Sequence, residues 1–211
     1  MLTILLILIP VVAGLLTLSL GGRNVKQLAL VGALAELGTV LLAWSQFDPA
    51  GGQQFGFKYD WIASAGVTLG AGLDGISLLL VLLTAFLTPL IILSAFGQSY
   101  KNPSAFYSLI LFMEAALIGV FTATDAFLFY LFFEAALIPV YFLAAVWGGE
   151  NRLKVTFKFF VYTIFGSLLM LVALVYVYFQ TPGQHSSEII ALYNVQLSAE
   201  AQGWVFWAFF I

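Results

Sequence analysis

Three glutamates lie inside long apolar runs of this sequence: Glu36, Glu114 and Glu134. A charged side chain at the centre of a membrane-spanning helix costs about 2.5–3.5 kcal/mol of insertion free energy on translocon scales. A carboxyl group kept at that cost usually binds and releases a proton or holds an ion. Glu134 is the strongest candidate, because the run around it, Ala126–Trp147, is otherwise almost wholly apolar.

Polar groups accompany Glu134 along one face of its helix. Tyr130 and Tyr141 stand four residues before it and seven after it, which is helical spacing. Pro139 has no N–H, so it leaves the carbonyl of Ala135 without its helical donor. Inside a membrane such a carbonyl needs a protein or water partner. We therefore expect a polar, hydrated stripe beside Glu134.

Glu114 and Glu134 are predicted to lie at one depth. Both stand about ten residues from a turn at 122–125, so each lies roughly 15 Å from the membrane surface. If both faced a common hydrated path, their titrations would be linked. Span six carries Lys154, Lys158 and Tyr162 at helical spacing, with Ser167 deeper in the span.

Other readings of these residues remain open. Glu134 and Glu114 could be neutral acids that hydrogen-bond a neighbouring helix, and Lys158 is close enough to the interface to extend its amine into water. Glu36 has few polar neighbours. It could hold two helices together through a contact between them, or lie in a partly hydrated position. In span three, Pro89 frees the carbonyl of Ala85 near two threonines, Thr84 and Thr88.

The composition places the chain in a membrane. Hydrophobic residues make up 63% of the 211 positions and charged residues 8%, with a mean hydropathy of +1.07, whereas soluble domains are about a quarter charged. There is no cysteine, which excludes disulfides, thiolate zinc sites and iron–sulfur ligation by this chain. A single histidine, His185, argues against a histidine-based metal or haem site.

The hydropathy pattern predicts an all-α polytopic bundle of six complete spans and the start of a seventh. Asp74 and Asp125 are expected to cap the helices that follow them. Within the glycine-rich segment 45–72, the pieces 54–61 and 67–69 predict a short β-hairpin. The predicted spans are Leu2–Leu20, 28–44, 75–96, two within 105–147, 155–179, and the incomplete run 203–211.

The last run bears on the domain organisation. Nine residues at 1.5 Å each cover about 13 Å, less than half of a hydrocarbon core. We therefore expect residues 1–211 to form a single membrane domain that is incomplete at its C-terminal end.

Loop charges predict the orientation. Cations concentrate in the loops after the first, third and fifth spans, which should face the cytoplasm, so the N-terminus should lie outside. Those cations are Arg23, Lys26, Lys101, Arg152 and Lys154, whereas the opposite loops carry Lys58 with Asp48, Asp60, Asp125, Glu188 and Glu200.

Three stretches resemble the subunit M (chain 4) family of proton-translocating NADH–quinone oxidoreductase, respiratory complex I. They read GLDGISLLLVLLTAFLTPLIIL (72–93), FMEAALIGVFTATDAFLFYLFFEAALIPVYFLAAVWGG (112–149) and KFFVYTIFGSLLMLVAL (158–174). The large subunits of this membrane arm resemble Mrp-type cation/proton antiporters. The similarity runs from about Gly72 onward and is weaker before it.

The resemblance assigns roles to residues. Glu134 matches the family's span-five glutamate, which pairs with a lysine of span seven expected beyond Ile211. Glu114 matches a span-four glutamate and Lys158 a span-six lysine, while Glu36 has no place in the family pattern. The chain would then be an N-terminal fragment that carries the first antiporter-like repeat incompletely.

The resulting hypothesis is a proton-translocating subunit of an oxidoreductase that holds no redox centre itself. NAD, FMN, iron–sulfur clusters and quinone are expected in partner subunits, and no cofactor or metal in this chain. The expected partners are other membrane-arm subunits, the lipid bilayer and protons, with no nucleic acid. The expected location is the bacterial inner membrane. The alternatives are a cation/proton antiporter subunit of Mrp or membrane-bound hydrogenase type, and a structural membrane scaffold.

Overall fold

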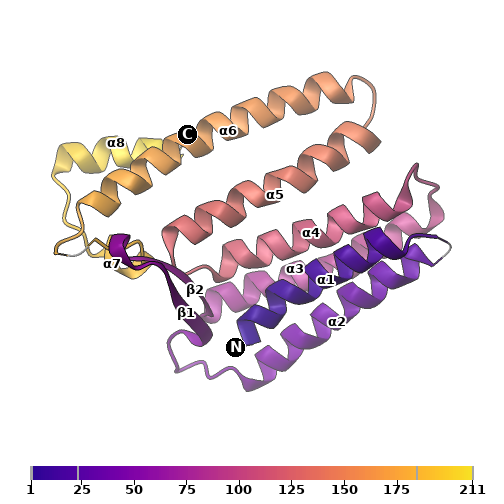
Figure 1. The fold of residues 1–211 in the computed structure, drawn as a ribbon, viewed down its shortest axis with the longest axis horizontal. Helices are drawn as coiled ribbons and strands as arrows, with labels where there is room; N and C mark the ends of the chain where they lie inside the picture. The colour runs from indigo at the N-terminus through magenta and orange to yellow at the C-terminus, as the bar shows by residue number, and fades with distance from the viewer. Residues whose placement is uncertain (1, 23, 184, 211) are drawn as a thin grey trace.

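A computed structural model describes residues 2–22, 24–183 and 185–210, so Arg23, one of the cations used above, lies outside the described residues. Long helices lie side by side, and a β-hairpin covers one end of the bundle (Figure 1). In chain order the elements are α1 (Leu2–Leu20), α2 (Val25–Gln46), β1 (Gln54–Ile62), β2 (Val67–Leu73), α3 (Gly75–Ser94), α4 (Pro103–Thr122), α5 (Ala126–Trp147), α6 (Arg152–Phe179), α7 (Ile189–Tyr193) and α8 (Ala199–Phe210).

Six of these helices, α1 to α6, are long and apolar enough to cross a membrane, as the sequence predicts. The chain is therefore built as a multi-pass membrane protein. The segment between α6 and the last helix contains the short helix α7, and α8 begins at Ala199, four residues before the predicted run 203–211. The first residues of α7 and of α8 do not lie in an apolar repeat long enough to be recognised in the sequence.

The predicted hairpin is confirmed and is longer than expected. β1 and β2 pair antiparallel, with Tyr59 opposite Leu69, and a 3₁₀ turn at Ala63–Ala65 joins them. Gly66 closes this turn at φ 60°, and a Cβ atom there would lie 1.9 Å from the carbonyl oxygen of His185. The hairpin is thus fitted against the segment that precedes α7.

Helices α1 to α4 form the closed part of the bundle. Two buried apolar clusters fill it, one around Leu111 and Ile92 and the other around Leu6 and Ile118. The α4 span is the most buried, at 56%, whereas only 17% of the α5 span is buried. Helices α5 and α6 therefore continue from a closed core into a more open layer (Figure 1).

Aspartates begin α3 and α5, as predicted. Asp74 accepts a hydrogen bond from the Ser77 amide while the Ser77 hydroxyl accepts one from the Asp74 amide, which makes a capping box. Asp125 accepts from the amides of Phe127 and Leu128 at 2.9 and 3.1 Å. These caps satisfy backbone donors that the first helical turn leaves free.

Asp125 also ties three segments together. Its second carboxylate oxygen accepts hydrogen bonds from the amide and hydroxyl of Thr68 in β2 and from the hydroxyl of Ser187 before α7. The carboxyl group is fully buried. Nearby, Lys58 and Glu188 form an ion pair of 2.6 Å between β1 and the start of α7. The start of α5, the helix that carries Glu134, is therefore firmly positioned.

Close packing fixes α5 against α4. Gly119 in α4 faces the ring of Phe132 in α5, and a Cβ atom at residue 119 would lie 2.4 Å from that ring. The two helices form the hairpin predicted for 105–147, with the turn at residues 123–125.

Candidate proton-handling site

Glu134 lies in the middle of α5, nine residues beyond its Asp125 cap. Its side chain is partly buried, and one carboxyl oxygen, Oε1, is buried without a hydrogen-bond partner among the described residues. A buried carboxyl oxygen without a donor is unfavourable unless water or a proton reaches it. The position is therefore suited to a group that exchanges protons.

Tyr130 links Glu134 to the next helix. Its hydroxyl lies within interaction range of both the Glu134 carboxyl group and the hydroxyl of Ser167 on α6. Ser167 is buried and donates to the carbonyl of Ile164 at 3.0 Å. Three groups that can donate or accept a proton therefore lie in a row between α5 and α6.

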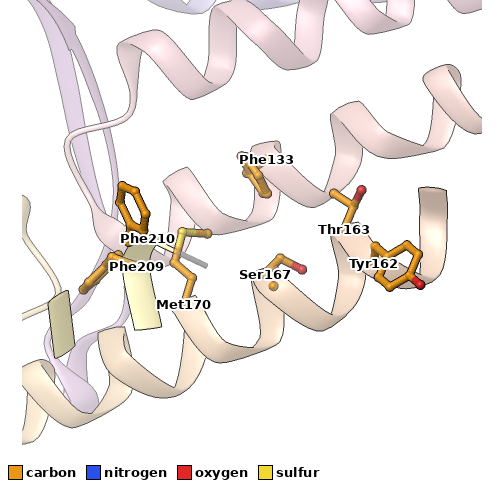
Figure 2. Close-up of a pocket in the computed structure, with 8 residues that line it drawn as sticks. Phe133, Tyr162, Thr163, Ser167, Met170, Phe209 and Phe210 are labelled. Atoms are coloured by element: carbon orange, nitrogen blue, oxygen red, sulfur yellow. The ribbon is translucent and has the colours of Figure 1, made fainter. Parts of the chain in front are cut away.

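An open cleft of about 410 Å³ lies beside this row. Figure 2 shows that α6 supplies most of its lining, with Phe133 on α5 and two phenylalanines of α8 closing the other sides. Because the cleft is open and carries hydroxyl groups, water can approach Ser167 from it. Its lining residues are Phe133, Tyr162, Thr163, Gly166, Ser167, Met170, Phe209 and Phe210.

Tyr141 lies on the α6 side of α5, as its spacing from Glu134 predicts. The centre of its ring lies 4.9 Å from that of Phe160 in α6. Pro139, which stands between Glu134 and Tyr141 in sequence, is buried. The polar stripe expected on α5 therefore faces α6 at Tyr130 and at Tyr141.

Lys158 lies in the second turn of α6 and its side chain is exposed. It is one turn before Tyr162, which borders the cleft, and near the level of Tyr141. That level is seven residues from Glu134, or about 10 Å along the helix axis. Among the described residues Lys158 is not placed against Glu134, and it stands at the far end of the line of polar groups on α6.

Glu114 is held in a different environment from Glu134. It is only 1% exposed, and the groups that interact with it are Thr88 of α3 and Glu36 of α2. Glu36 is fully buried, and all four oxygens of the two glutamates lack a hydrogen-bond partner among the described residues. No interaction between Glu114 and Glu134 is found among the described residues, and the acidic neighbour of Glu114 there is Glu36.

Sequence reasoning missed this pairing because depth along a helix does not fix the direction of a side chain. Glu36, for which a contact between two helices was one of the two readings, has its acidic neighbour on α4, a helix that does not follow α2 directly in sequence. Buried apolar residues seven positions apart flank each glutamate, Ala33 and Val40 for Glu36 and Leu111 and Ile118 for Glu114, but this burial is visible only in the structure.

Across residues 2–22, 24–183 and 185–210, no group of three or more histidine, aspartate or glutamate side chains could hold a metal ion. The candidate site is therefore composed of carboxyl, hydroxyl and phenol groups.

Comparison with protein families gives a match over residues 123–211 to the transmembrane family described as NADH:quinone oxidoreductase/Mrp antiporter. This segment contains Glu134, Lys158 and the whole lining of the cleft. Glu114 and Glu36 lie before it.

Individual relatives extend the similarity to most of the chain. F(420)H(2) dehydrogenase subunit M of Methanosarcina mazei is 41% identical over 175 residues, which are 81% of this chain and 35% of that protein. NADH-quinone oxidoreductase subunit M of Rickettsia prowazekii is 37% identical over 213 residues, covering 97% of this chain and 43% of the relative. The chain thus spans well under half the length of these relatives.

A solved structure agrees with the sequence relatives. A chain of respiratory complex I from Thermus thermophilus with bound NADH matches with a TM-score of 0.87 and 33% identity, over 99% of this chain and 42% of that one. Fold, family match and relatives all indicate the same group of membrane proteins. The chain belongs to the subunit M group of the NADH:quinone oxidoreductase/Mrp antiporter membrane family.

Proposed function

We propose that the chain is the N-terminal part of a proton-translocating membrane subunit of an NADH–quinone oxidoreductase. The observation that best supports this proposal is the environment of Glu134. Its carboxyl group lies at the middle of α5, next to Tyr130, Ser167 and an open cleft, and one of its oxygens is buried without a hydrogen-bond partner among the described residues. The subunit M relatives support the kind of complex in which this group would work.

In this proposal Glu134 binds and releases the translocated proton. Tyr130 and Ser167 each carry a hydroxyl that can accept a proton on one side and donate one on the other. Water in the cleft would connect Ser167 to the outside of the bundle. The proton would therefore pass between the cleft and Glu134 through two side chains, without crossing apolar packing.

Lys158 and Glu114 have separate proposed roles. Lys158, Tyr162, Thr163 and Ser167 follow one another along α6, so Lys158 would hold positive charge at the end of this polar line and bias the proton on Glu134. Glu114 would act from the other side of the hairpin, within the α1–α4 bundle. The span-seven lysine would come from sequence after Ile211.

The setting follows from the same proposal. The subunit would lie in a bacterial cell membrane with its N-terminus outside, and residues 1–211 would form one incomplete membrane domain. Other membrane-arm subunits and lipid would cover its outer faces. NAD, FMN, iron–sulfur clusters and quinone would be bound by partner subunits. The relatives named for F(420)H(2) and for NADH are similarly identical to this chain, at 41% and 37%, so the partner subunits would set the electron donor.

Purification of the full-length tagged subunit from its native membrane tests this assignment. We expect it to co-purify with NADH-dependent quinone reductase activity. If the purified assembly instead exchanges sodium for protons and contains no flavin or iron–sulfur spectrum, the antiporter alternative is correct and the proposal fails.

A further inference from the structure

A polar layer crosses the middle of the α1–α4 bundle between its two apolar clusters. In each of the helices α1 to α4, one residue of the first cluster and one residue of the second stand seven positions apart. Between them each helix has a buried residue of different character. The flanking pairs are Leu6 and Ala13, Ala33 and Val40, Ala85 and Ile92, and Leu111 and Ile118. The residues between them are Pro10, Glu36, Thr88 and Glu114, all buried.

Backbone acceptors are available at this layer. Pro10 and the buried Pro89 have no N–H, so the helical donor to the carbonyls of Leu6 and Ala85 is missing. Free carbonyl oxygens in an apolar environment need a donor. An ionised carboxylate supplies none, whereas a protonated carboxyl group or a water molecule supplies one.

Thr88 adds a further argument from hydrogen bonding. Its hydroxyl donates to the carbonyl of Thr84 at 3.0 Å, so its single proton is used and only its lone pairs remain for Glu114. An ionised Glu114 would then set oxygen lone pairs against oxygen lone pairs. A protonated Glu114 could donate to the Thr88 oxygen instead. The local geometry therefore favours a proton on this pair of glutamates.

No cation among the described residues would compensate a negative charge on Glu36 or Glu114. α1, α3 and β2 carry no ionisable side chain in sequence, and on α2 the only cation is Lys26, which binds the carbonyls of Phe96 and Gln98 at the helix end. On α4, Tyr107 donates to the carbonyl of Ala95. The ionisable groups of α5, which are Tyr130, Glu134 and Tyr141, are directed to the α6 side. Two negative charges at this position would lack any compensating group among the described residues.

We propose that Glu36 and Glu114 form a second proton-binding site inside the α1–α4 bundle, which holds a proton independently of Glu134. Thr88 and the carbonyls freed by Pro10 and Pro89 accept hydrogen bonds from the bound proton and its water. The inference rests on packing and hydrogen bonding and does not require the proposed pumping function.

Infrared spectroscopy of the full-length subunit in its reconstituted complex tests the site without turnover. A protonated carboxyl group has a carbonyl stretching band that an ionised one lacks. We expect the band of a buried carboxylic acid at neutral pH, a weaker or shifted band in Glu114→Gln, and loss of the band in the double variant Glu36→Gln/Glu114→Gln. The control Glu150→Gln, which alters an exposed loop residue, should change nothing. Glu36→Gln should move the pH at which the band disappears by about one unit or more, a tenfold change in proton binding.

The outcomes are decisive in either direction. Retention of the full band in the double variant Glu36→Gln/Glu114→Gln, or a titration unaffected by Glu36→Gln, overturns the proposal. A shift from Glu134→Gln as large as that from Glu36→Gln overturns its independence. If Glu114→Gln fails to assemble, Thr88→Val keeps both carboxyl groups and removes only the hydroxyl: the band should then change frequency, and an unchanged band refutes the site.

Discussion

The carboxyl group of Glu134 differs from those of Glu36 and Glu114 in what it can reach. Glu134 has Tyr130, Ser167 and an open cleft within its surroundings, whereas the other two are sealed between four helices. The sequence predicts which glutamates are functional candidates, because each raises the cost of insertion. It does not predict their partners, since those depend on helix rotation and on contacts between helices distant in sequence.

Asp125 is the residue whose removal should most weaken the frame around Glu134. Asp125→Ala leaves two helix amides and the Thr68 and Ser187 donors unsatisfied in a buried place. We expect a loss of on the order of 3 kcal/mol in stability. The melting temperature of the purified full-length subunit, followed by tryptophan fluorescence, measures it. Asp60→Ala, an exposed aspartate on β1, is the control, and equal shifts in both variants would contradict the role given to Asp125.

At the scale of elements, hydropathy and capping residues predict the six spans and the beginnings of α3 and α5. Long apolar runs have one stable form in lipid, which is the helix, so composition suffices. The hairpin is predicted only in part because its pairing depends on contacts with the segment before α7, which no local pattern encodes. The short helix α7 escapes prediction for the same reason, whereas α8 contains most of the predicted run 203–211 and begins before it, at Ala199.

Asp74 offers an element-scale prediction with a pH dependence. Hydrogen bonds from Ser77 lower the pKa of Asp74 below its ordinary value of 3.8. A carboxyl group with a lowered folded-state pKa contributes stability above its unfolded pKa and loses it as pH falls through the folded one. Asp74→Ala should therefore destabilise the subunit by about 1 kcal/mol at neutral pH. Thermal melts in detergent should show the gap closing in acid well below pH 3.8. A gap that stays constant as the pH falls far below 3.8, while the protein remains folded, would exclude the capping interaction as its source.

The whole molecule has two ends of different character. The hairpin, α7 and the α4–α5 turn gather at the end where the N-terminus lies, and the α1–α2, α3–α4 and α5–α6 connections lie at the other (Figure 1). This alternation is what six antiparallel spans require. Since the cation-rich loops are all at the second end, the charge argument for orientation applies to the molecule as built.

Cysteine labelling tests that orientation, and residues 1–211 contain no native cysteine that would react in its place. A cysteine at Lys101 or Asn151 should react with a membrane-impermeant reagent from the cytoplasmic side, and one at Gln53 from the outside. Labelling is scored by mass shift in intact cells and in inverted vesicles of the full-length protein. Reversed accessibility at these positions would overturn the proposed orientation.

Proton pumping by the complete complex carrying Glu134→Gln tests the central claim most directly. Gln preserves the size and hydrogen bonding of the side chain but cannot ionise. Electron transfer from NADH to quinone is measured in sealed vesicles together with internal acidification, after assembly is confirmed. We predict that Glu134→Gln loses most proton-coupled turnover, that Glu134→Asp keeps part of it, and that Glu150→Gln is unaffected. Near-normal acidification by the assembled Glu134→Gln complex would contradict the account.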